Sequence, residues 1–193
     1  MSSLEDLPDE ELVERWRQAE DRDLRAFEIL VARHEAQVLA NCRYLTGGSE
    51  EARDLAQEVF VKAFFGVDGF EGRARFGTWV QRIKINHCLN FLEKNKLRNA
   101  VSLEDEVVAV APQMQVPSRA EQEVVSRRDR RRIAAILRQL PDTLRVPLVL
   151  RDADGLSYQQ IADTLGVGLS AVKMRIKRGR EEFRRRYRRE VEG

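Results

Sequence analysis

The clearest chemical feature of this chain is a set of basic residues close together near its C-terminal end. The residues are Lys173, Arg175, Lys177, Arg178 and Arg180. Ammonium and guanidinium groups on one helix neutralise DNA phosphates and donate hydrogen bonds to base edges. The set therefore predicts contact with a nucleic acid. The alternative is a solvated basic helix at the end of a bundle.

The residues before this set predict how such a helix would be presented. Ser157 and Gln160 have the spacing of a capping box, which satisfies free N–H groups at the start of a helix. Gly166 permits the turn that ends this first helix, and the basic helix begins a few residues later. Ala162 is small enough for a close crossing, and Val172 anchors the second helix. The pattern indicates a helix-turn-helix, a motif whose second helix enters the DNA major groove.

The distribution of charge supports a polyanionic partner at the C-terminal end. The 193 residues carry a net charge of only +2. Residues 1–97 contain 14 basic and 18 acidic side chains, a balance of −4, and residues 98–118 contribute −2. Residues 119–193 contain 19 basic and 11 acidic side chains, a balance of +8. Concentration of positive charge at one end is typical of a nucleic-acid-binding segment.

Other features exclude several classes of protein. No apolar run reaches the roughly 18 residues of a membrane span, and no signal peptide opens the chain, so we expect a cytoplasmic protein without membrane insertion. Cys42 and Cys88 have no metal-ligand spacing and fall among apolar helical positions, which favours reduced core thiols. A redox pair between them remains open. His34 and His87 are too few for a metal site, and no cofactor is expected.

The positioning elements are predicted to be helices throughout. Apolar residues at three- and four-residue steps predict long helices over about 27–45, 49–66 and 76–95, after a short acidic helix over 9–16. Gly47 and Gly48 end the first long helix, and Ser49 is the expected N-cap of the second. That helix is expected to bury Ala52, Leu55, Ala56, Val59, Phe60 and Ala63. Residues 67–74 form a Gly-rich loop, and the helices predict one compact bundle.

The C-terminal part predicts a second helical unit. Residues 101–117 lack a period and contain two prolines and an acidic run, so an extended linker is expected. Ser118 and Glu121 have capping-box spacing and open a helix to about Leu140. The prediction is an all-α fold with two small helical domains joined by a flexible linker. Their limits are 8–97 for the first domain, 98–118 for the linker and 119–189 for the second domain.

Two blocks of residues resemble regions 2 and 4 of bacterial sigma factors. The first block is Asp54-Leu-Ala-Gln57-Glu58-Val-Phe60, then Phe70-Glu-Gly72, then Phe76-Gly-Thr78-Trp79-Val-Gln-Arg82-Ile83-Lys-Ile-Asn86. The second is Leu140-Pro141, Leu150-Arg151, Gly155-Leu156-Ser157-Tyr158, Ile161-Ala162, Val172-Lys173, Arg175-Ile176 and Arg178-Gly179-Arg180. With only a linker between the blocks, the chain resembles the extracytoplasmic-function (ECF) group of the sigma-70 family, which lacks the region 3 domain.

The resemblance implies three groups of site residues. Arg53, Asp54, Gln57 and Glu58 would contact the clamp helices of the RNA polymerase largest subunit. Phe70, Trp79, Lys84 and Asn86 would hold the promoter −10 element, aromatic and amide groups being receptors for unpaired bases. The alternative for Trp79 is that it is an aromatic residue of the hydrophobic core. Region 4 would read the −35 element with Ser170, Ala171, Lys173, Met174, Arg175, Lys177, Arg178 and Arg180.

The implied function is that of an alternative-type sigma factor, without catalysis. Its partners would be the polymerase core, including the clamp helices and the flap, promoter DNA and an anti-sigma factor. The run from Lys84 to Asn90 departs from the usual family pattern, which leaves the −10 preference open. The alternative is a free-standing helix-turn-helix regulator, which would need a dimer seam or a ligand pocket. A helical enzyme with an added DNA-binding domain lacks any catalytic constellation.

Overall fold

The protein, in a computed structural model, is built of helices. The structure describes residues 3–18, 24–48, 50–101 and 127–192, and these ranges contain helices and turns without a strand. The all-α prediction is confirmed. The α-helices are α1 (Asp9–Gln18), α2 (Leu24–Thr46), α3 (Ala52–Gly66), α4 (Phe76–Val101), α5 (Arg127–Arg138), α6 (Asp142–Asp152), α7 (Tyr158–Leu165) and α8 (Leu169–Glu192), with 3-10 turns at Leu4–Asp6 and Val67–Gly69.

Helices α1–α4, the N-terminal half, pack through the predicted apolar stripes. Helix α3 buries the six residues expected of it, Ala52, Leu55, Ala56, Val59, Phe60 and Ala63. Helix α4 continues to Val101, past the predicted end near residue 95. The expected N-cap Ser49 lies outside the described residues; α3 begins after Glu51, which makes no side-chain capping bond.

Helices α5–α8, the C-terminal half, contain the predicted helix-turn-helix. Ser157 accepts a hydrogen bond from the backbone N–H of Gln160 at 3.2 Å, and the Gln160 side chain accepts one from the backbone N–H of Ser157 at 2.8 Å. Gly166 ends α7 in the left-handed conformation, with φ 62°. Val172 is buried in α8, as predicted. The expected linker and the Ser118–Glu121 capping box lie outside the described residues.

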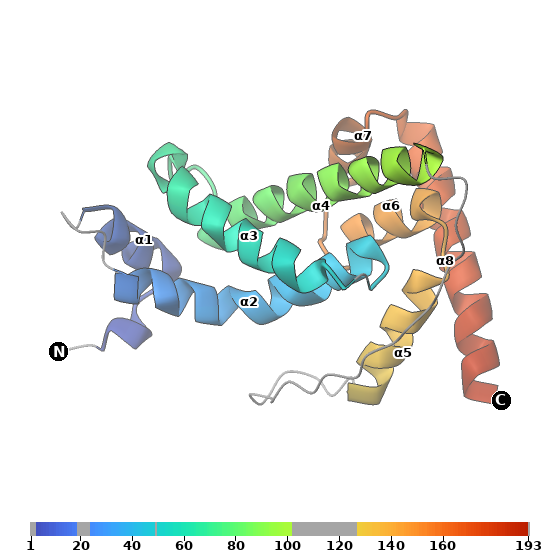
Figure 1. Cartoon of the computed structure of the whole chain (residues 1–193), viewed down its shortest axis with the longest axis horizontal. Coiled ribbons are helices and arrows are strands. Elements are labelled where there is room, and N and C mark those ends of the chain that lie inside the picture. Colours follow the sequence, from blue (N-terminus) through green and yellow to red (C-terminus); the bar gives the residue numbers. More distant parts are fainter. Residues whose placement is uncertain (1–2, 19–23, 49, 102–126, 193) are drawn as a thin grey trace.

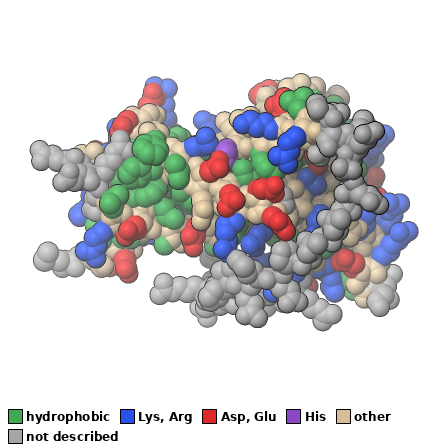
Figure 2. Space-filling model, in the orientation of Figure 1, with side chains coloured by type: hydrophobic (Ala, Val, Ile, Leu, Met, Phe, Trp, Pro, Cys, Tyr) green, Lys and Arg blue, Asp and Glu red, His purple; other side chains and the backbone are tan. Residues whose placement is uncertain are grey.

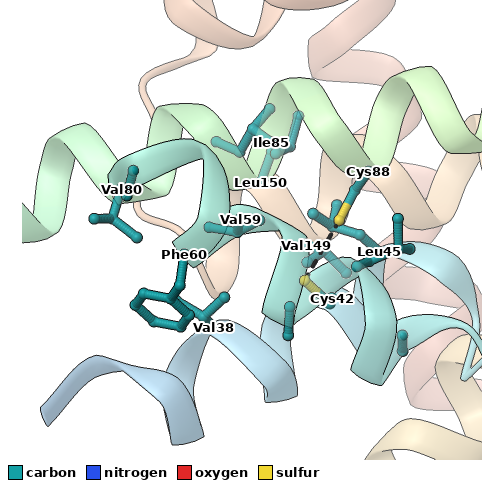
Figure 3. Packing of buried hydrophobic residues seen from close by; sticks show 14 of the residues in the cluster. Val38, Cys42, Leu45, Val59, Phe60, Val80, Ile85, Cys88, Val149 and Leu150 are labelled. Carbon is teal, nitrogen blue, oxygen red and sulfur yellow. Dashed lines mark hydrogen bonds between the residues drawn. The ribbon is translucent and has the colours of Figure 1, made fainter. Parts of the chain in front are cut away.

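The two halves share one hydrophobic core rather than standing apart. Helices α6, α7 and α8 lie at one end of α2 and α4 (Figure 1). Val149 and Leu150 of α6 belong to the same buried cluster as Leu45 and Ile85 (Figure 3). The predicted limits of the two domains stay a prediction, but the described parts of those domains are in contact.

Both cysteines lie in this shared core, which confirms their prediction as core residues. Cys42 and Cys88 are fully buried free thiols, with Sγ atoms 3.5 Å apart across α2 and α4 (Figure 3). Their mutual hydrogen bond lowers the pKa of Cys42 and raises the pKa of Cys88. The two sulfurs are hydrogen-bonded but are not joined by a disulfide.

The turn of the helix-turn-helix provides a test of the backbone argument. Gly166→Ala should lower the free energy of unfolding by about 1 kcal/mol, because L-residues are disfavoured in the left-handed region. An added Cβ meets nothing within 4 Å, so the cost comes from the backbone. Gly168→Ala is the matched control: its φ is not positive and its Cβ also meets open space. Chemical denaturation of both variants measures this difference. Equal midpoints for the two variants would contradict a left-handed conformation at Gly166.

Candidate nucleic-acid and protein interfaces

The basic helix α8 carries the predicted −35 contacts at its exposed N-terminal end. Val172 and Ile176 face the core, with 0% and 1% of their surfaces exposed. Ser170, Lys173, Met174, Lys177 and Arg178 are exposed, whereas Ala171, Arg175 and Arg180 are half-buried. The buried pair fixes the rotation of the helix, and this rotation turns Lys173 and Met174 to solvent. An N-terminal end presented in this way suits major-groove docking.

Several basic side chains of α8 are already paired within the protein. Arg180 donates two hydrogen bonds to the carboxylate of Asp152, at 3.0 and 2.5 Å, and this contact raises the pKa of Arg180. Arg185 and Arg186 both donate to Glu182, at 2.6 and 2.7 Å. A DNA phosphate would compete with these carboxylates for the arginines. Lys173, Lys177 and Arg178 have no such partner among the described residues.

The aromatic side chains predicted to hold an unpaired base are packed together. Phe70 is 6% exposed, and its ring centroid lies 5.1 Å from that of Trp79. Phe76, fully buried, lies 5.9 Å from Trp79 and 6.3 Å from Phe70. Trp79 is half-buried, so in this arrangement it takes the core role that the sequence left open. Phe70 is almost completely covered by these contacts, whereas Trp79 keeps part of its surface exposed.

Lys84 differs most from its predicted role. It was expected to contact a −10 phosphate, but it is only 1% exposed. Its Nζ donates to Oδ1 of Asp154, a residue of the turn between α6 and α7, at 2.5 Å. The C-terminal half therefore covers Lys84, and a phosphate cannot reach it in this arrangement. The sequence gives no sign of this pairing, because the two residues lie 70 positions apart.

Asn86, the fourth residue predicted for the −10 element, stays accessible. It is exposed on α4 and lines a cleft that α7 bounds on the other side. Gln160, Asp163 and Thr164 line the α7 side of this cleft. A DNA strand bound at Asn86 would therefore meet the first helix of the helix-turn-helix.

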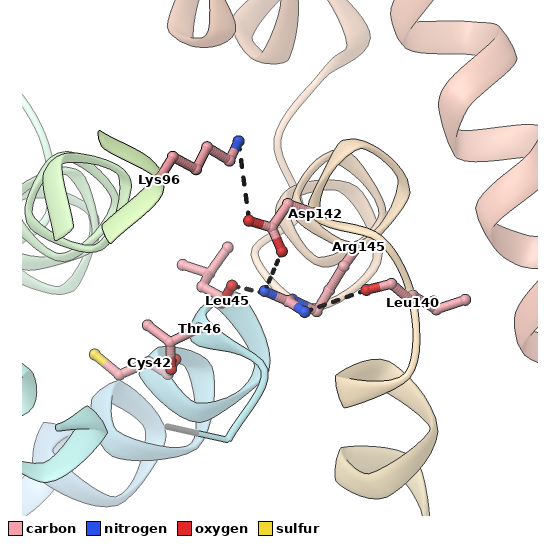
Figure 4. A network of polar contacts seen from close by, with 7 residues as sticks. All are labelled: Cys42, Leu45, Thr46, Lys96, Leu140, Asp142 and Arg145. Atoms are coloured by element: carbon pink, nitrogen blue, oxygen red, sulfur yellow. Dashed lines mark hydrogen bonds and ion pairs between the residues drawn. The ribbon is translucent and has the colours of Figure 1, made fainter. Parts of the chain in front are cut away.

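A second polar contact between the halves, missed by the sequence analysis, centres on Arg145. This α6 side chain is buried, and it donates to the backbone oxygens of Leu45 and Leu140, each at 3.2 Å, and to Asp142 at 2.7 Å (Figure 4). Burial lowers the pKa of Arg145, and Asp142 opposes that effect. By binding the Leu45 carbonyl, Arg145 caps the C-terminal end of α2, where carbonyls lack helical partners. The sequence feature that could have indicated this contact is the presence of an arginine among the apolar residues of α6.

Helices α2 and α3 form an apolar groove on the N-terminal half. The groove has a volume of about 600 Å³, and Arg53 and Gln57 line it together with Val61 and Phe65. Phe65 is 73% exposed, and Val61 is also exposed. Figure 2 shows hydrophobic side chains gathered in this part of the surface. The sequence analysis missed both residues, although their spacing from Gln57 in steps of four places all three on one helical face.

Of the four residues predicted to contact the polymerase, Arg53 and Gln57 line this groove and the other two do not. Asp54 and Glu58 are exposed on α3. The Glu58 carboxylate lies 2.7 Å from Nε2 of His87 on α4.

Among the residues that the structure describes, there is no group of three or more metal-ligating side chains. No described helix is long and apolar enough to cross a membrane.

Comparison with known proteins identifies the family. Residues 30–98 match the model of Sigma-70 region 2, and residues 130–183 match that of Sigma-70, region 4. The chain is 34% identical over 182 residues to the ECF RNA polymerase sigma-E factor of Escherichia coli, covering 92% of this chain and 93% of that protein. It is 33% identical over 180 residues to the RNA polymerase sigma-H factor of Pseudomonas aeruginosa, covering 90% of each.

Two solved structures share the fold. One is of CnrH in complex with the cytosolic domain of CnrY, with a TM-score of 0.53, 26% identity and coverage of 91% of this chain and 94% of that one. The other is of the sigma factor RpoE in complex with the anti-sigma factor NepR from Bartonella quintana, with a TM-score of 0.58, 22% identity and coverage of 84% and 96%. On the sequence matches, this chain belongs to the ECF group of the sigma-70 family of RNA polymerase sigma factors.

Proposed function

We propose that this sigma factor binds core RNA polymerase through the α2–α3 groove and its rim, and that it reads promoter DNA with α4 and α8. The observation that carries the proposal is the presence, in one chain, of an exposed apolar groove on region 2 and a helix-turn-helix in region 4. A free-standing helix-turn-helix regulator is not favoured, because residues 30–98 match Sigma-70 region 2 in addition to the match of residues 130–183 to region 4. The residues 8–97 and 119–189 would be the two working domains.

The roles of the residues follow from their surroundings. Phe65 and Val61 supply apolar contact area, and Arg53, Asp54, Gln57 and Glu58 orient the polymerase clamp helices by charge-assisted bonds. Region 4 docks the N-terminal end of α8 into the −35 element, and the polymerase flap holds it at a fixed distance from region 2. The protein itself catalyses no reaction, and it works where the polymerase works, in the cytoplasm.

The −10 element requires a different arrangement of the two halves. Lys84, Phe70 and Trp79 are covered or packed here, whereas Asn86 is accessible. We propose that polymerase binding separates region 4 from region 2 and exposes Lys84, so that it can act with Asn86. An anti-sigma factor would act in the opposite direction, by covering the same surfaces. The structural relatives bound to CnrY and to NepR support such a partner.

The groove proposal predicts the effect of removing its most exposed side chain. Phe65→Ser should weaken binding to core polymerase by about 30-fold, since a central aromatic anchor contributes about 2 kcal/mol. Run-off transcription should fall in parallel and recover at high sigma concentration. Leu97→Ser, which removes a 64% exposed side chain of α4 away from the groove, is the control and should bind normally. Equal affinities for the two variants would refute the groove as the docking site.

A second prediction concerns promoter melting. Asn86→Ala should leave polymerase affinity unchanged and reduce open-complex formation about tenfold, because one base would lose its hydrogen-bonding receptor. Permanganate footprinting of unpaired thymines measures this. Asn90→Ala, one helical turn further along α4 and also exposed, is the control. If thymine reactivity is unchanged in Asn86→Ala, Asn86 has no role in promoter melting.

A third prediction separates base reading from phosphate binding on α8. Lys173→Ala should change the preferred −35 sequence, by about 1–3 kcal/mol at one base pair. Arg178→Ala should weaken binding to all −35 sequences alike. It should also make the slope of log affinity against log salt concentration shallower by about one unit. Selection from randomised −35 sequences at two salt concentrations distinguishes the two. A shift of sequence preference with Arg178→Ala, and none with Lys173→Ala, would show that the reading face is placed wrongly.

A further inference from the structure

The turn between α6 and α7 inserts one carboxylate into the N-terminal half. The side chain of Asp154 has no exposed surface. Its Oδ1 accepts hydrogen bonds from Lys84 at 2.5 Å and from Asn41 at 2.6 Å. The backbone oxygen of the same residue accepts one from Gln81 at 2.6 Å. Three side chains of region 2, from α2 and α4, thus converge on one residue of region 4.

This contact is more than a surface ion pair. Exposed pairs contribute little to stability, because water screens both charges. Here both charges are out of water, so each needs the other: removal of one partner leaves a buried, uncompensated charge. The second oxygen, Oδ2, is buried and has no hydrogen-bond partner among the described residues. The site on region 2 is therefore satisfied by an anionic oxygen, and the anion that occupies it here belongs to the chain itself.

The position of the contact matters for DNA binding. Lys84 lies on the same helix as Asn86, and the cleft that holds Asn86 is lined by Gln81 and by Asp154 itself. With Asp154 in place, α7 stands over this part of α4. A DNA strand approaching Asn86 would have to displace the turn, and its phosphate would compete with the carboxylate for Lys84.

We propose that Asp154 is an intramolecular latch: it occupies the Asn41–Gln81–Lys84 site, holds regions 2 and 4 together, and blocks single-stranded DNA from α4 until region 4 is drawn away. The blocking role rests on the proposed function of α4 in −10 binding; the holding role does not. Free protein would therefore be self-inhibited, and the apparent affinity for a strand is reduced by the small fraction of open molecules.

The test compares full-length Asp154→Asn with the wild type in the absence of polymerase. The amide keeps the size of the side chain but leaves Lys84 buried without a counter-charge, so the closed form should be abandoned. Small-angle X-ray scattering should show a larger radius of gyration. A short fluorescein-labelled single strand of mixed sequence should bind about tenfold more tightly, measured by anisotropy. An unchanged radius together with unchanged strand affinity would overturn the latch.

Two further variants keep the result decisive. Asp163→Asn makes the same charge change on α7 at the same cleft, but Asp163 is exposed and does not enter the site; its radius should match the wild type. Gln81→Ala removes one bond to Asp154 without leaving a charge, and it should tighten strand binding about fivefold. If circular dichroism shows that Asp154→Asn does not fold, the Gln81→Ala measurement alone decides. A strand affinity of Gln81→Ala equal to that of the wild type would then overturn the latch.

Transcription separates this inference from the proposed function. With saturating core polymerase, Asp154→Asn should give as much run-off transcript as the wild type, because the polymerase already holds the regions apart. If neither protein gives a transcript, the proposed function fails, while the scattering result still decides whether Asp154 holds the halves together. If the variant expands but binds the strand no better, the blocking role is wrong.

Discussion

Closure of the two halves onto each other is the constraint on which the rest of this structure depends. It is made by apolar contact, with Val149 and Leu150 entering the core of the N-terminal half, and by two buried polar residues at separate points, Arg145 and Asp154. Polar groups lose hydration on burial, so these two residues are tolerated only where they find their hydrogen-bond partners. That requirement fixes one relative orientation of the two halves, which apolar packing alone would not do. That orientation decides which surfaces of the two halves face solvent.

The closed arrangement sorts the surfaces of the protein by availability. The α2–α3 groove and the N-terminal end of α8 face solvent, whereas Lys84 is covered. The surfaces proposed to meet the polymerase and duplex DNA are thus exposed, whereas the surface proposed to hold melted DNA is exposed at Asn86 but covered at Lys84. This order suits a factor that should engage single strands only after assembly with the enzyme that opens them.

Local features of the sequence predicted the fold well, because each depends on neighbouring residues. The capping box at Ser157, the left-handed Gly166 and the six buried positions of α3 follow from short-range spacing. The roles of Lys84 and Phe70 could not be predicted in the same way. A lysine on a helix can bind a phosphate or a distant carboxylate, and an aromatic ring can stack on a base or in the core. Only the tertiary arrangement distinguishes these, and it depends on partners such as Asp154, far away in the chain.

The meeting of Gly47 and Arg145 limits how this chain can vary over evolutionary time. Gly47 has a φ of +71°, and a Cβ built on it would lie 2.6 Å from Nη1 of Arg145. A larger residue at position 47 is thus opposed twice, by its backbone and by the guanidinium group. Such a residue would have to displace the guanidinium group, and the displacement would disturb the cap of α2. The two positions, almost a hundred residues apart, are therefore expected to vary together.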